Sequence, residues 1–414
     1  MVSKSHPLLP IFLIVFVDVL AFTLVLPYLP FFAERYGASP LQVGLIITAF
    51  ALCQFLSGPV LGRMSDQMGR KPILILSQIG TCLGFVMLAL SQSLWMVYLA
   101  RILDGITAGN ITVAQAAISD ITPPKERAKS FALIGVSFGL GFFIGPAIAG
   151  ALLHFGTQAP AWGAAVISFI SILSTVFLFR DSPIVHADKK PFRLSFADLA
   201  HAFNFKPIQR YLKNAALKPL LIQFFFFNLS FSAHISCFAL FAERRLHYEG
   251  HPFGPKEVSY LYAYLGLLGI IIRSTVIQRL IERFGERVTS RIGFAAQGIG
   301  FLAYAWVHTI PGALIAATIG SLGSGIIRPT VSAQMSRIVT PKEQGELFGV
   351  SQSLASIAAI AAPLIAGYLL GHASPFAWAV FTGLSVLLAL FFNSPSSSTE
   401  TKNASENIAP TLTT

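Results

Sequence analysis

The sequence predicts an all-α membrane protein with twelve transmembrane helices arranged as two similar six-helix bundles. Three observations predict this fold class. First, the 414-residue chain is 54% hydrophobic and 11% charged, with a mean hydropathy of +0.69, which is outside the range of soluble proteins. Second, apolar stretches of about 20 residues, the length that crosses a bilayer core of roughly 30 Å, recur along the chain. Third, segments of the second half repeat segments of the first.

Six apolar stretches precede a basic, proline-containing segment, and six follow it. This order predicts an N-terminal bundle over residues 1–185, a cytoplasmic linker over 186–212, a C-terminal bundle over 213–393 and a disordered polar tail over 394–414. Between Phe192 and Leu217 the linker has the periodicity of an amphipathic helix in the headgroup region, which Pro207 is expected to break. The expected spans cover residues 8–31, 41–62, 72–91, 94–118, 129–153, 160–179, 213–243, 257–279, 287–308, 310–335, 346–371 and 374–393.

The distribution of basic residues predicts the orientation of the chain. With the N-terminus in the cytoplasm, 22 of the 29 Lys and Arg residues fall in cytoplasmic loops or tails, as the positive-inside rule requires. This explains the net charge of +11 without a nucleic-acid partner. We therefore expect a multi-pass protein with both termini in the cytoplasm, in a bacterial inner membrane. The basic residues on the outer side are Arg35, Arg244, Arg245 and Lys256, and those inside spans are Arg101, Arg273 and Arg328.

Residue types that would indicate an enzyme or a metal protein do not form motifs here. Cys53, Cys82 and Cys237 fall inside spans without paired spacing, so no disulfide framework and no metal site is expected. A nucleotide-binding loop, a zinc motif and a nucleophile with a base are all missing. A polytopic enzyme or receptor is accordingly disfavoured, and we expect no cofactor.

The internal repeat identifies two equivalent loops. The stretch "GRMSDQMGRK" at residues 62–71 has a weaker counterpart in "QRLIERFGER" at 278–287, which is 216 residues later. Duplicated six-helix bundles occur in secondary transporters, where the substrate site lies between the halves near the bilayer midplane. The matched pairs are Asp66 with Glu282 and Gly69 with Gly285, and, at an offset of 217, Lys125 with Lys342, Glu126 with Glu343, Pro146 with Pro363 and Gly150 with Gly367.

The first of these loops resembles the signature Gly-x-x-x-Asp-x-x-Gly-Arg-Lys of the major facilitator superfamily. The resemblance covers residues 8 to 393 and implies a cytoplasmic gate. Asp66 would lie against the positive N-terminal end of the helix that starts near Glu346, and Arg70 would reach Asp120. The alternative is that these charges only anchor the loop at the membrane surface. The gate residues are Gly62, Asp66, Gly69, Arg70, Lys71, Asp120, Glu282 and Gly285.

The stretch "RILDGITAGN" resembles a membrane-embedded arginine segment of the same family. A guanidinium inside a bilayer costs at least ~2.5 kcal/mol, so Arg101 should pair or face water. Its candidate partners are Asp104, on the same helical face, and Asp18, near the middle of the first span. We assign Arg101, Asp104 and Asp18 to proton coupling, with Asp18 as the proton carrier; a permanent ion pair between two helices is the alternative.

The stretch "GVSFGLGFFIGPAIAG" resembles the antiporter motif of the family, with Ala149 in place of one glycine. Small residues four apart allow close helix packing, and a proline inside a helix favours a bend. In the family this motif is typical of drug and proton antiporters. The motif residues are Gly141, Gly145, Pro146 and Gly150.

Sparse polar residues among aromatic ones predict a cavity for an amphipathic organic substrate. His234 is either a second titrating group or a hydrogen-bonding helix contact, and Arg273 either lines the cavity or extends to the membrane surface. The expected cavity residues are Asn110, Gln115, Asn228, Ser232, His234, Arg328 and Gln334.

The first half resembles the tetracycline exporters within the drug and proton antiporter group. Where those exporters carry an acid in the third helix, a histidine in the eighth and an aspartate in the ninth, this chain has Gly84, Gly269 and Gln297. The resemblance therefore implies a monomeric, proton-coupled exporter of a small amphipathic compound, without implying tetracycline. A nutrient symporter or uniporter on the same fold is the alternative.

Overall fold

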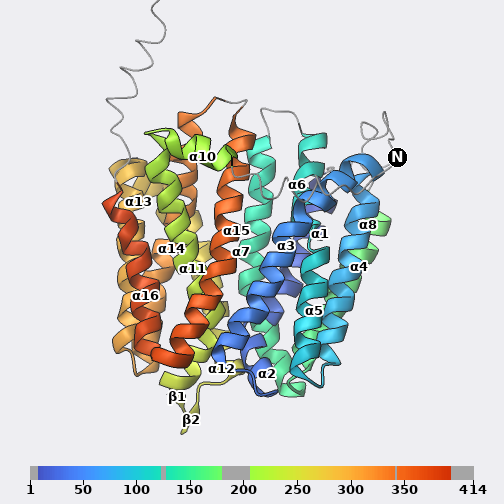
Figure 1. Cartoon of the computed structure of the whole chain (residues 1–414), viewed down its shortest axis with the longest axis vertical. Helices are drawn as coiled ribbons and strands as arrows, with labels where there is room; N and C mark the ends of the chain where they lie inside the picture. The colour runs from blue at the N-terminus through green and yellow to red at the C-terminus, as the bar shows by residue number, and fades with distance from the viewer. Residues whose placement is uncertain (1–7, 123–126, 180–205, 341–342, 393–414) are drawn as a thin grey trace, which may run out of the picture.

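The computed structural model describes residues 8–122, 127–179, 206–340 and 343–392, and these residues form two adjacent helical bundles (Figure 1). Nine helical segments within the described residues are long and apolar enough to cross a membrane. One of them, Pro255–Trp306, contains two spans, because Gly285 at φ 73° turns the chain inside α13. With the shorter helices α5, α6 and α16, the structure follows the expected twelve spans.

The N-terminal bundle contains six spans, of which the first and fourth are interrupted. Ser39 and Gln42 cap α3 reciprocally, and Gly69, at φ 102°, makes the tight turn into α4. The elements are α1 (Leu8–Val25), α2 (Leu29–Glu34), α3 (Pro40–Met68), α4 (Arg70–Ala89), α5 (Leu94–Thr107), α6 (Asn110–Ile121), α7 (Arg127–Leu152), the short helix η1 (Leu153–Phe155) and α8 (Ala159–Leu178).

The C-terminal bundle repeats this plan after a short helix, α10 (Lys206–Lys213). A hairpin with Glu249 and Gly250 at positive φ joins the first two spans of this bundle. The elements are α11 (Leu217–Arg245), β1 (His247–Tyr248), β2 (His251–Pro252), α12 (Pro255–Ile271), the π-turn η3 (Ile272–Val276), α13 (Ile277–Ala303), η4 (Tyr304–Trp306), α14 (Ile310–Ile338), α15 (Gln344–Tyr368), η5 (Leu369–Ala373), α16 (Pro375–Leu387) and η6 (Leu388–Phe391).

Two details differ from the expected elements. The 94–118 span is not one helix: it breaks at Ala108 and Gly109, where the Ser77 hydroxyl accepts a hydrogen bond from the Gly109 N–H at 2.9 Å. Pro207 does not break a helix, since it is the second residue of α10, where the missing N–H costs nothing. The linker before residue 206, the tail after 392, and Lys125, Glu126 and Lys342 of the repeat lie outside the described residues.

The bundles pack together along two pseudo-equivalent helix pairs, α3 with α15 and α7 with α12. We call the end that carries α2 and the β hairpin the hairpin end, and the end that carries α10 and the 62–71 loop the linker end (Figure 1). At the hairpin end, glycines allow the contact: a Cβ at Gly44 would overlap the Pro363 carbonyl, and one at Gly150 would lie 3.0 Å from the Tyr260 ring. Thr48 donates to the Ile360 carbonyl across the same interface at 2.9 Å.

Toward the linker end the close packing is lost. A Cβ at Gly135 of α7, or at Gly345 or Gly349 of α15, would meet no atom within 4 Å. The structure is thus closed at the hairpin end and open toward the linker end.

Candidate functional site

A buried ion pair lies inside the N-terminal bundle, on α5. Arg101 and Asp104 are each 3% exposed, and Nη1 of Arg101 lies 3.0 Å from Oδ2 of Asp104. The guanidinium also lies over the rings of Phe50 and Phe85, at 5.6 and 5.3 Å from their centres. Of the two candidate partners of Arg101, the structure selects Asp104.

Gly84 makes room for this pair. A Cβ at Gly84 would lie 3.1 Å from the Cβ of Asp104 and 3.2 Å from the carbonyl oxygen of Ala100. Gly84 stands where the tetracycline exporters carry an acid in the third helix. In this structure it packs directly against an acidic residue of α5, Asp104. A side chain at position 84 would displace Asp104.

Asp18 lies in the middle of α1 without a cationic partner among the described residues. Its Oδ1 accepts a hydrogen bond from the Ser171 hydroxyl of α8 at 2.8 Å, and that hydroxyl accepts one from Gln78 of α4 at 2.7 Å. Its Oδ2 is buried without a hydrogen-bond partner. Asp104 is close enough for its charge to act on Asp18. Sequence reasoning missed the two partners, because Ser171 and Gln78 belong to no motif.

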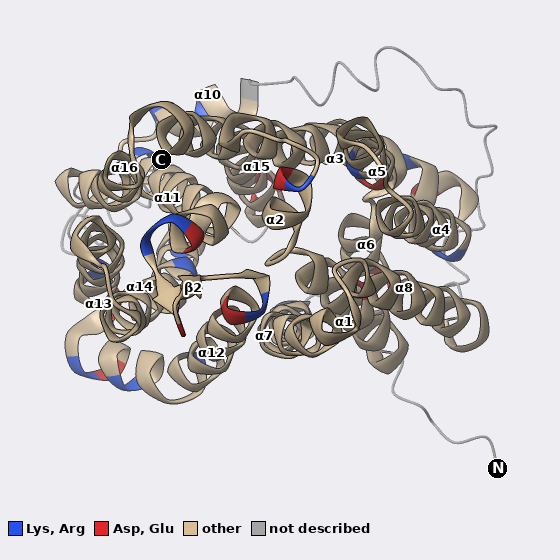
Figure 2. Ribbon diagram, turned by 90° about the horizontal axis from the view of Figure 1, so that it is seen from below, with Lys and Arg blue, Asp and Glu red and all other residues tan. Residues whose placement is uncertain are grey.

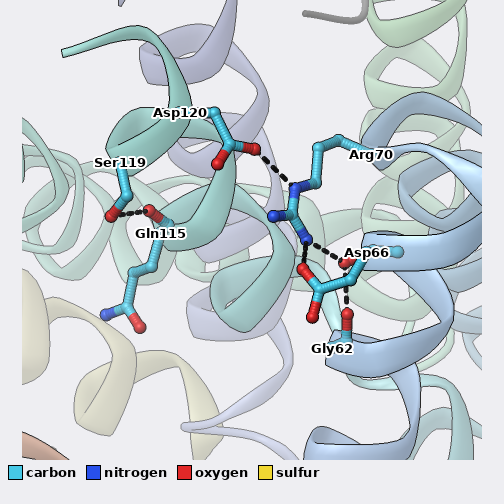
Figure 3. A network of polar contacts seen from close by, with 7 residues as sticks. Gly62, Asp66, Arg70, Gln115, Ser119 and Asp120 are labelled. Carbon is cyan, nitrogen blue, oxygen red and sulfur yellow. Dashed lines mark hydrogen bonds and ion pairs between the residues drawn. The ribbon is translucent and has the colours of Figure 1, made fainter. Parts of the chain in front are cut away.

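The gate residues of the first loop form a network within the N-terminal bundle (Figure 3). Arg70 donates from Nε to Asp120 at 2.8 Å, and from Nη1 to Ser65 at 2.7 Å and to Asp66. Ser65 in turn donates to the carbonyl of Gly62 at 2.6 Å. The expected contact between Arg70 and Asp120 is present.

Two other gate residues act differently from expectation. Lys71 donates to the carbonyl of Val176 on α8 at 2.7 Å, which fastens the start of α4 to its neighbour. Gly62 lies inside α3 and makes no turn. A Cβ added at Gly62 would lie 3.5 Å from the methyl group of Thr112. The turn belongs to Gly69 alone because only that glycine has positive φ.

The gate is not closed across the bundles in this structure. The Asp66 side chain is 59% exposed, although it is bonded to Arg70. The first turn of α15, its expected partner, instead contacts α10: Arg210 lies 3.6 Å from Glu343 and 3.5 Å from Glu346. In the repeated loop, Glu282 accepts from Gln278 on its own helix at 2.8 Å, and Gly285 makes the turn.

The antiporter motif joins three helices. Gly141 and Gly145 of α7 face α1, where a Cβ at Gly141 would lie 2.7 Å from Val19 and one at Gly145 would overlap Thr23. Thr23 donates to the Gly141 carbonyl at 2.8 Å. Gly150 faces Tyr260 of α12 in the other bundle, and Pro146 lies inside α7, which stays helical through it. The motif therefore connects the Asp18 helix to the bundle interface.

The expected cavity residues do not gather around one space. His234 is 5% exposed and stacks on Phe301 at 4.1 Å between ring centres, and also on Trp378 at 5.8 Å. It therefore belongs to the aromatic core of its bundle, and its assignment to the cavity is wrong in this structure. Gln334 is also a bundle contact, since it donates to Ser290 at 3.2 Å and to the Glu286 carbonyl at 3.4 Å.

The remaining cavity candidates differ in exposure. Gln115 and Arg328 are exposed, whereas Asn110 is buried with an unpartnered Oδ1. Asn228 and Ser232 are half-buried, and Asn228 donates to the Phe224 carbonyl of its own helix at 2.7 Å.

An ion pair that sequence reasoning missed closes the hairpin end. Arg244 of α11 lies 3.0 Å from Glu34 of α2, so it joins the two bundles. Figure 2, which shows this end, has red and blue segments at the end of α2 and near α11. Burial and the neighbouring carboxyl of Glu243 raise the pKa of Glu34 to about 7, against the opposing effect of Arg244. A cavity of about 400 Å³ beside this pair is lined by Glu34, Glu243, Phe31 and Pro255, among others.

Comparison with known proteins finds a matching family, similar sequences and solved structures with this fold. The profile of the Major Facilitator Superfamily matches residues 11–279 and 271–413. The tetracycline resistance protein of class B from Escherichia coli is 30% identical over 92% of this chain and 94% of its own length. The class H protein from Pasteurella multocida is 29% identical over 87% and 88%. The crystal structure of the human organic anion transporter MFSD10 superposes with a TM-score of 0.70 at 24% identity, covering 95% of this chain and all of that one.

Proposed function

Because this chain belongs to the Major Facilitator Superfamily, we propose that it is a proton-coupled antiporter that exports a small amphipathic compound. The similarity of this chain to tetracycline resistance proteins supports export of a drug-like compound. The antiporter motif in α7 supports antiport rather than the alternative, a nutrient symporter or uniporter.

The observation that carries the proposal is the environment of Asp18. Arg101 is already paired with Asp104. The hydrogen-bonding groups beside the Asp18 carboxyl are therefore neutral side chains, those of Ser171, Gln78 and Asn110. A carboxyl group without a permanent counter-ion can exchange its proton when its access to water changes. Asp18 thereby has the property that a proton carrier needs, and the Arg101–Asp104 pair supplies fixed charges beside it.

The transport cycle follows from the two ends of the molecule. With the linker end open, substrate enters between the bundles and Asp18 releases its proton to that side. Rocking of the bundles then brings exposed Asp66 to the N-terminal end of α15 and separates Glu34 from Arg244. Asp18 takes up a proton from the opposite side as the substrate leaves.

The setting of this activity completes the proposal. The linker end faces the cytoplasm, in keeping with the basic loops that it carries, and the membrane is a bacterial inner membrane. The protein acts as a monomer, needs no cofactor, and uses the proton gradient as its energy source.

Transport by inside-out vesicles tests the proposal. A panel of growth inhibitors first identifies a compound to which cells with the gene are more resistant than cells without it. We expect vesicles to accumulate that compound when their lumen is acidic and to stop when a protonophore is added. Accumulation that is indifferent to the protonophore, or accumulation by right-side-out cells instead, would reject proton-driven export.

A further inference from the structure

Two arginines of the C-terminal bundle lie at the same depth in the membrane. Arg273 is the second residue of the π-turn η3, and it follows Pro255, the first residue of α12, by 18 residues. Arg328 of α14 follows Ile310, the first residue of its helix, also by 18 residues. At 1.5 Å per residue both lie about 27 Å from the hairpin end. The helices meet at this depth, since a Cβ at Gly325, three residues before Arg328, would lie 3.1 Å from the side chain of Ile272, the neighbour of Arg273; the charge of Arg273 acts on Arg328.

Neither arginine has a counter-ion among the residues that the structure describes. Within the described part of the chain, no hydrogen bond or ion pair joins either guanidinium to another residue. The sequence from Val258 to Ile281 and from Ile310 to Ile338 contains no acidic residue. The acidic residues of this bundle all lie near helix ends: Glu243, Glu249, Glu257, Glu282, Glu286, Glu343 and Glu346.

Arg273 faces the other bundle and packs against α7. Its Nη1 lies 3.6 Å from the position of a Cβ at Gly139 on α7, so the side chain does not extend to the membrane surface. A Cβ at Gly269, one turn earlier on the same face as Arg273, would meet no atom within 4 Å. The same holds at Gly135, one turn from Gly139 toward the linker end. Close packing of α7 is therefore lost within one turn of the Arg273 contact, on the side of the linker end.

Two unpaired cations at one depth need an explanation in chemical terms. They repel each other, and each would be costly in lipid. Both residues are nevertheless exposed rather than buried in the core of their bundle. The π-turn that carries Arg273 is an irregularity frequently found at functional sites. An acidic group between the two guanidiniums would offset one or both positive charges, depending on whether it is a carboxylate or a phosphate, and each guanidinium presents a planar fork that fits such a group.

We propose that Arg273 and Arg328 bind the acidic group of the substrate, so that the transported compound is an organic anion. The acidic group is a carboxylate, sulfonate or phosphate. The apolar body of the substrate would lie beside Gly135, where α7 is not packed against the other bundle. This inference rests on the proposed function, because it places the site in the transport pathway.

Equilibrium dialysis tests the proposal on purified full-length protein in nanodiscs. The probes are radiolabelled 1-naphthoate and 1-naphthylmethylammonium, which share an apolar body and differ in charge; 4-biphenylcarboxylate and 1-naphthyl phosphate extend the series. We expect wild type to bind at least one of the three acids, and the amine at least about tenfold more weakly. Arg273→Gln and Arg328→Gln should each weaken acid binding about tenfold to a hundredfold.

Matched variants control for folding. Arg279→Gln removes an exposed charge six residues further along the chain and should bind acids as wild type does. Arg273→Lys and Arg328→Lys keep the charge, and should prefer the acids over the amine with intermediate affinity. Equal binding of acid and amine by wild type, binding of none of the three acids, or acid binding that the Gln and Lys variants leave unchanged would overturn the proposal.

Two further comparisons separate the sources of failure. Equal naphthoate affinity in phosphatidylcholine and phosphatidylglycerol nanodiscs supports a soluble substrate. Loss of naphthoate binding in phosphatidylglycerol nanodiscs would show that the arginines hold a lipid headgroup, and it would overturn the proposal. Because dialysis uses no proton gradient, acid binding without proton-driven transport supports the anion site and rejects only the proposed function. Proton-driven export of a cationic compound, without acid binding, rejects only the anion site.

Discussion

Arg101 and Asp104 form a pair whose contribution to stability can be separated from its contribution to transport. Both side chains are almost fully buried, and two aromatic rings cover the guanidinium. A buried pair often adds little net stability, but removal of one partner leaves an uncompensated charge. The charges are therefore retained for a reason other than stability, which we take to be their effect on Asp18.

We predict that Asp104→Ala lowers the free energy of unfolding by about 3 to 5 kcal/mol. The double variant Arg101→Met with Asp104→Asn should be close to wild type in stability, because it removes both charges and nearly keeps the volume of each side chain. Neither variant should transport. Unfolding in a denaturing detergent and uptake by vesicles measure the two properties. Asp104→Ala with wild-type stability would show that Arg101 has another partner.

Glu34 predicts a pH dependence of the contact between the bundles at the hairpin end. Its pKa in the closed contact is about 7, above the ordinary 4.5. The closed contact therefore binds an extra proton between these values, and it loses stability as the pH rises through this window. Above pH 7 Glu34 is ionised beside the Glu243 carboxyl group, which opposes its charge, and only its ion pair with Arg244 compensates.

We predict that the hairpin end separates more readily at pH 8 than at pH 5. Pulsed electron paramagnetic resonance between nitroxide labels at Gln158 and Tyr248, in a chain whose three native cysteines are replaced by alanine, measures this distance. The population of the long distance should rise with pH in wild type. It should be the same at both pH values in Glu34→Gln, and a dependence that persists in this variant would assign the effect to another group.

The 62–71 loop and its repeat differ in their contacts, and so they should differ in function. In the first loop, Arg70 holds two carboxylates, and Asp66 stays exposed for α15. In the second, Glu282 bonds only to Gln278 among the described residues, on its own helix. The stronger network lies in the loop whose sequence matches the family signature more fully.

We predict that Asp66→Asn lowers vesicle transport by at least about tenfold, since an amide cannot make the charge-assisted contacts of the carboxylate. The amount of full-length protein in the membrane should not change. Glu282→Gln is the matched control and should keep most of the activity. Normal transport by Asp66→Asn would mean that the cluster only fixes the topology of the loop.

The helices could be predicted from sequence far better than the partners of their polar side chains. Hydropathy located all twelve spans because twenty apolar residues have few alternatives to a membrane helix. It could not locate the break at Gly109, which depends on a hydroxyl of another helix, Ser77. Likewise, the family pattern identified Arg70 with Asp120, and helical spacing gave Asp104 as one of two candidate partners of Arg101.

Contacts between elements without a motif could not be predicted. Ser171 meets Asp18 and Glu34 meets Arg244 only because the bundles are folded in this way. His234 shows the opposite error: a polar residue in an apolar helix suggested a cavity, but its ring stacks in an aromatic core. A single sequence does not distinguish the face of a helix that lines a cavity from the face that packs inside a bundle.

On the scale of the whole molecule, the structure is one end state of a rocking cycle. Contacts along α3 with α15 and α7 with α12 close the hairpin end, while the linker end is open. Because the bundles pack closely at glycines, their contact depends on how well the two surfaces fit. A small rotation of one bundle against the other can therefore open the hairpin end and close the linker end. The account requires that this exchange be coupled to a proton at Asp18.

Proton release on substrate binding by the purified protein tests this coupling most directly. In weakly buffered detergent solution containing a pH indicator dye, addition of the exported compound should release protons from wild type and from Glu346→Gln, whose carboxylate lies at the surface beside Arg210. We predict no substrate-induced release from Asp18→Asn, even at substrate concentrations that saturate binding. Release of the same number of protons by Asp18→Asn would contradict the account.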